Sequence, residues 1–154
     1  MPPASGLLTV ATIALTVLLA VVIVFQLALA AGAPWGVAAY GGAHRGVLPT
    51  RLRIASGVAA ALWVALGLVL LRRTGYSVPA VLPDGVLAVA GWIIFAILAL
   101  SVILNAITPS VLERAIWLPV TLLLAAATLV IALAPQQNEQ WDGSDAPCAS
   151  NPSH

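Results

Sequence analysis

The side chains that could do chemistry lie in two stretches of this sequence, around residues 26–53 and 105–114. Together these stretches supply two side-chain amides, an imidazole, one carboxylate and several guanidinium groups. Such groups at the edge of a membrane can bind the polar head of a small amphiphile, although membrane proteins also place polar residues at interfaces for solvation alone. The candidate polar cluster consists of eight residues: Gln26, His44, Arg45, Arg51, Arg53, Asn105, Glu113 and Arg114.

The residues that several familiar membrane activities need are missing from the apolar segments. A bundled haem needs two histidines, but His44 lies in a loop and His154 ends the chain. Retinal needs a lysine, and a disulfide-exchange enzyme needs paired cysteines, whereas the chain has no lysine and only Cys148. Clustered carboxylates for Mg²⁺ are also absent, as is an acid in the middle of a span for a cation-coupled exporter. We therefore predict no catalytic residues, cofactor or metal, and expect a protein that is not an enzyme.

Composition identifies the elements that must position these groups. Of the 154 residues 62% are hydrophobic and only 7% are charged, and the mean hydropathy is +1.08. So few charges cannot cover a water-facing surface, and a net charge of +1 offers no basic face for nucleic acid. The sequence therefore predicts an integral membrane protein.

Four apolar runs are each close to the length of about 20 residues that crosses a bilayer. We predict an all-α, four-helix transmembrane bundle over residues 1–134, with helices at about 6–31, 54–71, 86–106 and 111–134. The first run ends in a small-x-small pattern, Ala28-Leu29-Ala30, but it is long for a signal core and no cation precedes it, so we expect an uncleaved helix. Residues 135–154 form a polar tail that we expect to be disordered.

Local signals mark the helix ends. Ser110 and Glu113 have the spacing of a capping box, which would start the fourth helix, and Thr50 could cap the second. Glu113 has a competing interpretation as the ion-pair partner of Arg51 or Arg53. Arg51 and Arg53 before the apolar part of the second helix, and Arg72 and Arg73 after it, are expected to extend to the two membrane interfaces.

The distribution of arginines predicts the orientation. With four spans, the segment 32–53 and the segment 107–114 share one side and carry four arginines, whereas Arg72 and Arg73 lie on the other side. The positive-inside rule then places both termini outside the cytoplasm in a multi-pass protein of the cell membrane.

The segment 32–49 is unusual because it contains five glycines and two prolines among 18 residues, with no charge before Arg45. One interpretation is a lid or re-entrant loop that delivers His44 and Arg45 to a site. The favoured one is an interfacial connector, with Trp35 and Tyr40 at the level of the headgroups.

Small residues at Gly57, Ala61 and Ala65 allow close helix packing, within the chain by default or in a homodimer. We expect a small membrane scaffold or a subunit of a membrane-protein complex. The alternative is a binder of a small amphiphile, a lipid or a quinone-like molecule, with Arg51, Arg53 or His44 at its head and an apolar pocket beside them.

Three motifs carry a resemblance to a known group: GAPWG (32–36), GGxHRGxLPxRLR (41–53) and NAxxxSxxERxxW (105–117). At these motifs the chain resembles small uncharacterised four-span integral membrane proteins of high-GC bacteria. The resemblance covers residues 7–134 and implies a four-span fold, but it brings no activity, ligand or site residue.

Overall fold

The computed structural model describes residues 3–79 and 83–134, and the predicted tail at 135–154 lies outside this part of the chain. Within the described residues all regular structure is helical, and four long helices dominate it. They are α1 (Pro3–Ala31), α2 (Thr50–Arg73), α3 (Leu87–Ile107) and α4 (Val111–Leu133). Each helix is long and apolar enough to cross a membrane. The prediction of an all-α bundle of four membrane-spanning helices is therefore confirmed.

The second helix starts earlier than its apolar run. Residue Pro49 is its N-cap, and the Pro49 carbonyl accepts hydrogen bonds from the amides of Leu52 and Arg53. The expected Thr50 cap is wrong, because Thr50 is already the first helical residue and no side chain caps this helix. The fourth helix starts as predicted, since the Ser110 hydroxyl accepts a hydrogen bond from the Glu113 amide at 3.2 Å.

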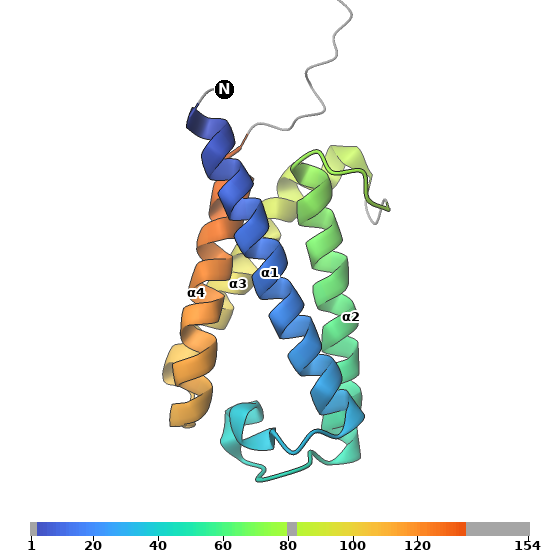
Figure 1. Ribbon diagram of the computed structural model, residues 1–154, viewed down its shortest axis with the longest axis vertical. Helices are drawn as coiled ribbons and strands as arrows, with labels where there is room; N and C mark the ends of the chain where they lie inside the picture. The colour runs from blue at the N-terminus through green and yellow to red at the C-terminus, as the bar shows by residue number, and fades with distance from the viewer. Residues whose placement is uncertain (1–2, 80–82, 135–154) are drawn as a thin grey trace, which may run out of the picture.

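The helices form two antiparallel pairs that splay apart at one end (Figure 1). Helices α1 and α2 meet at the connection 32–49, and α3 and α4 meet at the connection 108–110. Both connections lie at the same end of the bundle, which we call the loop end. At the opposite end, which we call the terminal end, α1 begins, α4 ends and α2 connects to α3. The segment 32–49 runs across the gap between the two pairs at the loop end.

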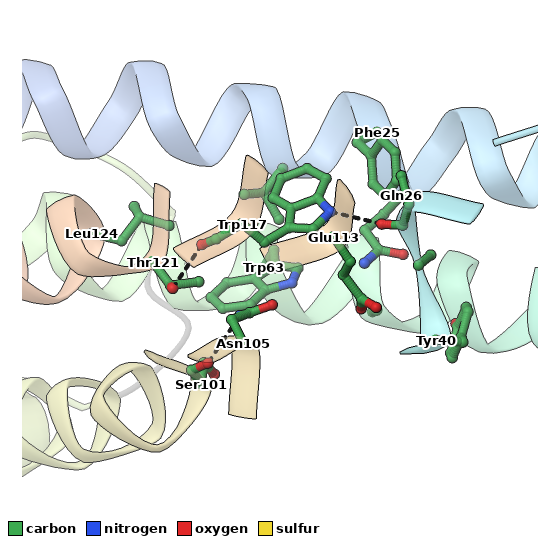
Figure 2. A pocket seen from close by; sticks show the side chains of 14 residues that line it. Phe25, Gln26, Tyr40, Trp63, Ser101, Asn105, Glu113, Trp117, Thr121 and Leu124 are labelled. Atoms are coloured by element: carbon green, nitrogen blue, oxygen red, sulfur yellow. Dashed lines mark hydrogen bonds between the residues drawn. The ribbon is translucent and has the colours of Figure 1, made fainter. Parts of the chain in front are cut away.

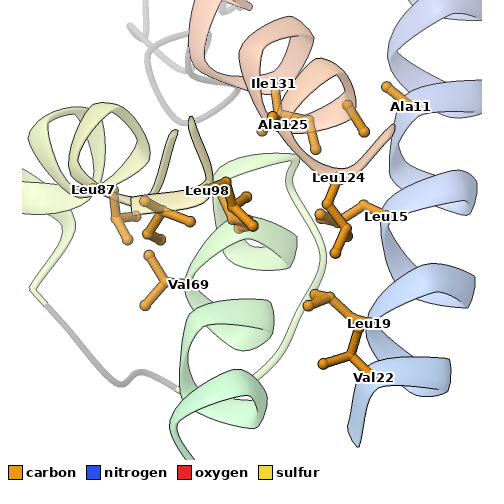
Figure 3. Close-up of a cluster of buried hydrophobic side chains, with 13 residues drawn as sticks. Ala11, Leu15, Leu19, Val22, Val69, Leu87, Leu98, Leu124, Ala125 and Ile131 are labelled. Atoms are coloured by element: carbon orange, nitrogen blue, oxygen red, sulfur yellow. The ribbon is translucent and has the colours of Figure 1, made fainter. Parts of the chain in front are cut away.

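The buried core fills the terminal half of the bundle (Figure 3). Helix α1 contributes residues between 11 and 22, α2 residues 69 and 70, α3 residues between 87 and 98, and α4 residues between 124 and 131. Leu15, Leu124 and Ile131 are completely buried. Because lipid is as apolar as these side chains, close packing rather than the hydrophobic effect holds the helices together here.

Gly67 lets α2 approach α1 closely, whereas Gly57 lies at an ordinary van der Waals distance from its neighbour on α1. A Cβ at Gly67 would lie 3.1 Å from Cδ1 of Leu19, and a Cβ at Gly57 would lie 3.8 Å from Cβ of Ala30. In the predicted small-residue stripe, Gly57 therefore faces α1, whereas Ala61 is exposed. The stripe is only partly used within the chain.

The outer faces of all four helices are apolar and exposed, as at Val17, Leu62, Ile93 and Leu123. A soluble monomer rarely exposes so much contiguous apolar surface. The hydroxyls on the helices mostly bond to carbonyls one turn back, as Thr12 does to Leu8 at 2.8 Å. Both features suit a chain surrounded by hydrocarbon.

The terminal end is tied together by Arg73, the last residue of α2. Its Nε donates to the Ile131 carbonyl at 3.0 Å, its Nη2 to the Ala132 carbonyl at 2.7 Å and its Nη1 to the Leu87 carbonyl at 3.2 Å. The Ile131 and Ala132 carbonyls lie in the last turn of α4, where carbonyls lack intrahelical partners, and the same guanidinium reaches the first residue of α3. The expected extension of Arg73 to the interface is therefore wrong, because the side chain is only 7% exposed and turns inward.

Candidate functional site

A cavity of about 360 Å³ lies in the loop half of the bundle, beyond the packed core. All four helices and the segment 32–49 contribute to its wall (Figure 2). The lining residues are Val22, Phe25, Gln26, Ala38, Ala39, Tyr40, Ala59, Trp63, Ser101, Asn105, Glu113, Trp117, Thr121 and Leu124. In Figure 1 the two helix pairs diverge toward this end, where the segment 32–49 lies, and residues from both pairs and from this segment line the cavity.

Helical spacing directs these side chains into one space. Residues four apart lie on the same face of a helix, as Ser101 and Asn105 do on α3. The Asn105 Nδ2 donates to the Ser101 carbonyl at 2.9 Å, which fixes the amide along this face. On α4 the same spacing relates Glu113, Trp117 and Thr121, so one stripe of that helix supplies an acid, an indole and a hydroxyl.

Trp117 forms the wall between α1 and α4. Its ring packs on Phe25 with centroids 4.5 Å apart at an angle of 58°, and Phe25 in turn stacks on Trp35 at 6.1 Å. The Trp117 Nε1 donates to the Ala38 carbonyl at 2.8 Å, so the indole also holds the connection in place. The single donor of this half-buried indole is therefore satisfied, and the side chain lines the cavity.

Glu113 lines the cavity from the first turn of α4. Its Oε2 accepts a hydrogen bond from the Thr108 hydroxyl at 2.9 Å. The competing interpretation, an ion pair with Arg51 or Arg53, is wrong, because Arg53 instead donates from Nε to the Ala30 carbonyl at 3.0 Å and Arg51 is exposed. One half of the predicted capping box is present, because the Ser110 hydroxyl accepts from the Glu113 amide. The Glu113 carboxylate accepts from Thr108 instead of from the Ser110 amide, and it lines the cavity.

The segment 32–49 is a packed structure that closes the loop end. Its residues Ala39 and Leu48 form a small buried core with Leu29 of α1. The Gly36 amide donates to the Gly46 carbonyl at 3.0 Å, and a Cβ at Gly36 would lie 2.7 Å from the His44 carbonyl oxygen, so only glycine fits there. The segment therefore acts as a fixed cover over the end of the bundle.

The connection delivers a different residue to the cavity from the pair that the lid interpretation named. His44 and Arg45 do not line the cavity, whereas Tyr40 does. The Tyr40 hydroxyl lies 2.9 Å from Ser56 Oγ and donates to the Leu52 carbonyl at 3.2 Å, and both partners are on α2. These bonds hold Tyr40 in the left-handed region, with φ of 53°, a conformation that non-glycine residues seldom adopt. The phenol is thus tied to α2 by two hydrogen bonds, and its predicted place at the level of the headgroups stays a prediction.

The predicted polar cluster divides into two sets. Gln26, Asn105 and Glu113 line the cavity. The cations lie at the same loop end but outside the cavity lining, because Arg53 binds the Ala30 carbonyl and Arg114 donates to the Thr108 carbonyl at 3.3 Å. The remaining members of the predicted cluster are outside it as well: His44, Arg45 and Arg51.

Sequence reasoning missed the aromatic and hydroxyl members of the site. Trp63, Trp117, Ser101 and Thr121 line the cavity but lie inside apolar runs. Their spacing of four residues from another lining residue on the same helix is a signal that could have found them.

No group of three or more His, Cys, Asp or Glu side chains that could hold a metal ion occurs among residues 3–79 and 83–134. No protein-family model, curated protein or solved structure matches this chain. The site must therefore be interpreted from its own residues.

Proposed function

We propose that this membrane protein binds a small amphiphile in the cavity at the loop end. The observation that carries the proposal is the cavity itself, about 360 Å³ with aromatic walls and polar groups converging from α1, α3 and α4. Binding sites for small molecules are commonly apolar spaces of about 300–1,000 Å³ with a few placed polar groups. A bundle that served only as a packing scaffold would have no need of such a space.

An apolar groove on the outer surface supports a ligand that arrives from the lipid phase. This groove lies between α1 and α4, along Val17, Val21, Val24 and Ile116. Phe25 and Trp117 line both the groove and the cavity, so this aromatic pair is the shared wall between lipid and cavity. An amphiphile could place its apolar part against these rings and its polar head deeper in the bundle.

The polar head would contact different residues from those that the sequence indicated. We assign the contact to Gln26, Asn105 and Glu113, which line the cavity, rather than to Arg51, Arg53 or His44. The head would therefore be one that donates hydrogen bonds to amide and carboxylate oxygens.

We further propose that the cavity faces the cytoplasm. Four of the six arginines lie at the loop end, in 32–53 and at Arg114, and the positive-inside rule places that end in the cytoplasm of the cell membrane. Both termini would then be extracytoplasmic.

The role of scaffold or partner subunit stays a prediction, as does a homodimer through Gly57, Ala61 and Ala65. Either would rest on a stoichiometric protein companion. The same measurement that tests for a ligand would detect that companion by its mass.

Native mass spectrometry of the full chain, released from a mild detergent, tests the proposal. We expect a retained small molecule on the wild-type protein. In the variant Ala59→Phe a phenyl ring would occupy the cavity, whereas Ala61→Phe adds the same ring to an exposed position of the same helix. The retained mass should be lost in Ala59→Phe and kept in Ala61→Phe.

Two results would overturn amphiphile binding at this site. One is a wild-type protein that carries no small molecule after extraction and gains none on incubation with total lipid extract. The other is an adduct that both phenylalanine variants retain equally, because it would lie outside the cavity.

A further inference from the structure

We infer that the cavity selects a protonated amine with an apolar body. The inference rests on the proposed function, because it names the chemical class of ligand for the same cavity. Three independent features of the lining carry it: its charge, an unpaired acceptor and its aromatic rings.

The first feature is the charge of the lining. Glu113 is the one charged side chain among the described residues that line the cavity. The nearby guanidinium groups of Arg53 and Arg114 donate to the carbonyls of Ala30 and Thr108 and do not line the space. A half-buried carboxylate beside aromatic walls is stabilised by a cation that brings a hydrogen-bond donor.

The second feature is the side chain of Gln26. Its Oε1 is buried and has no hydrogen-bond partner, although a buried carbonyl oxygen is normally paired. In Figure 2 the Gln26 amide and the Glu113 carboxylate lie at the same end of the cavity, on facing helices. A ligand N–H group could donate to the Glu113 carboxylate and, after a turn of the Gln26 side chain that exposes its buried oxygen, to Oε1 as well, whereas a carboxylate or phosphate head could donate to neither.

The third feature is the aromatic wall. Phe25, Tyr40, Trp63 and Trp117 all line the cavity. The faces of aromatic rings attract ammonium groups, with tryptophan the strongest, and they also pack well against an apolar body. Carboxylate, free acceptor and aromatic rings together favour a cationic head over a neutral or anionic one.

A matched set of probes tests this selection. 4-Phenylbutylamine, 4-phenylbutan-1-ol and 4-phenylbutanoate share one body and differ only in the charge of the head at pH 7, where an alkyl amine is protonated. Binding would be measured by calorimetry on the full chain in phosphatidylcholine nanodiscs, with empty nanodiscs as the reference. We expect the amine to bind at least about ten-fold more tightly than the alcohol, which is the gain that one charge-assisted hydrogen bond provides. The butanoate should bind more weakly than the alcohol.

Two variants and one control test which side chains select the amine. Glu113→Gln keeps a hydrogen-bonding group in the capping position and at Thr108 but removes the charge. It should bring the amine to within about two-fold of the alcohol, while Arg51→Gln, an exposed change at the same end, should leave the ratio unchanged. Gln26→Leu leaves Glu113 in place and should weaken the amine about five-fold through loss of its second acceptor.

The outcomes separate this inference from the proposed function. If the alcohol binds as tightly as the amine, and Ala59→Phe abolishes both, amine selection is overturned while the cavity remains a binding site. If the butanoate binds most tightly, amine selection is overturned in favour of the nearby arginines. If none of the three probes binds, amine selection is overturned, and the native mass measurement decides the proposed function separately.

Discussion

Gly42 lies directly against Ser110, so that a Cβ at Gly42 would come within 2.8 Å of the Cβ and Oγ atoms of Ser110. The Ser110 hydroxyl at this contact accepts from the Glu113 amide and donates to the Val37 carbonyl at 3.1 Å. One residue thus starts α4 and anchors the connection between α1 and α2. The close approach of Gly42 is what lets the connection reach α4.

The substitution Gly42→Ala should strongly reduce stability, because its methyl group would overlap Ser110. The matched control is Gly46→Ala: both glycines have positive φ, 71° and 92°, but a Cβ at Gly46 would meet nothing within 4 Å. Both variants carry the left-handed strain of about 1–2 kcal/mol, and overpacking should add about 1–3 kcal/mol for Gly42→Ala alone. Unfolding in mixed micelles measures the difference. Equal losses would mean that the connection does not dock on α4 as described.

The substitution Trp117→Phe should loosen the cover of the cavity while keeping an aromatic wall. It removes the donor to the Ala38 carbonyl, a hydrogen bond worth about 1 kcal/mol. This free energy corresponds to about a five-fold change in the equilibrium constant for local opening of residues 36–48. Hydrogen exchange of the amides in 36–48 should speed up by about that factor. Trp92→Phe, at an exposed site on α3, is the control and should leave this exchange unchanged. Unaltered exchange in Trp117→Phe would contradict the anchoring role.

The substitution Arg73→Met should destabilise the terminal end of the bundle. It preserves much of the stem but leaves the carbonyls of Leu87, Ile131 and Ala132 without their charged donor, at a cost of about 2–3 kcal/mol. The same change at the exposed Arg51 should cost less than about 0.5 kcal/mol. Comparable losses in the two variants would show that Arg73 does not clamp the helices.

A second substitution tests the close contact between Gly91 and the Arg73 side chain. A Cβ at Gly91 would lie 3.2 Å from the Cδ and Nε atoms of Arg73. Gly91→Ala should therefore lower stability by about 1 kcal/mol in the wild-type background. The effect should shrink in the Arg73→Met background, because the flexible thioether side chain can move aside. Full additivity of the two changes would argue against this contact.

The orientation is testable through the single cysteine of the chain. With both termini outside, a membrane-impermeant maleimide should label Cys148 on intact cells. In a Cys148→Ser background, Ala43→Cys places a thiol at an exposed position of the loop end, which should react only after the cells are permeabilised. The opposite labelling pattern would reverse the orientation and turn the cavity away from the cytoplasm.

The sequence by itself determined the class of the protein and the number of its spans. Apolar runs, the near absence of charge and the Ser110 cap are local features, and a bilayer offers an apolar segment of this length few choices other than a helix. Alternation of the spans also brings Gln26, Asn105 and Glu113 to one end, whatever the packing. These features required no knowledge of how the helices contact one another.

Only the tertiary structure decided which polar side chains face the cavity and which do not. The rotation of each helix about its axis depends on packing with its neighbours, and periodicity says little when every face of a helix is apolar. Sequence could therefore not separate Glu113, which lines the cavity, from Arg53, which binds the Ala30 carbonyl. It also could not foresee that Arg73 turns inward, because the carbonyls that it satisfies belong to helix ends that are distant in the chain.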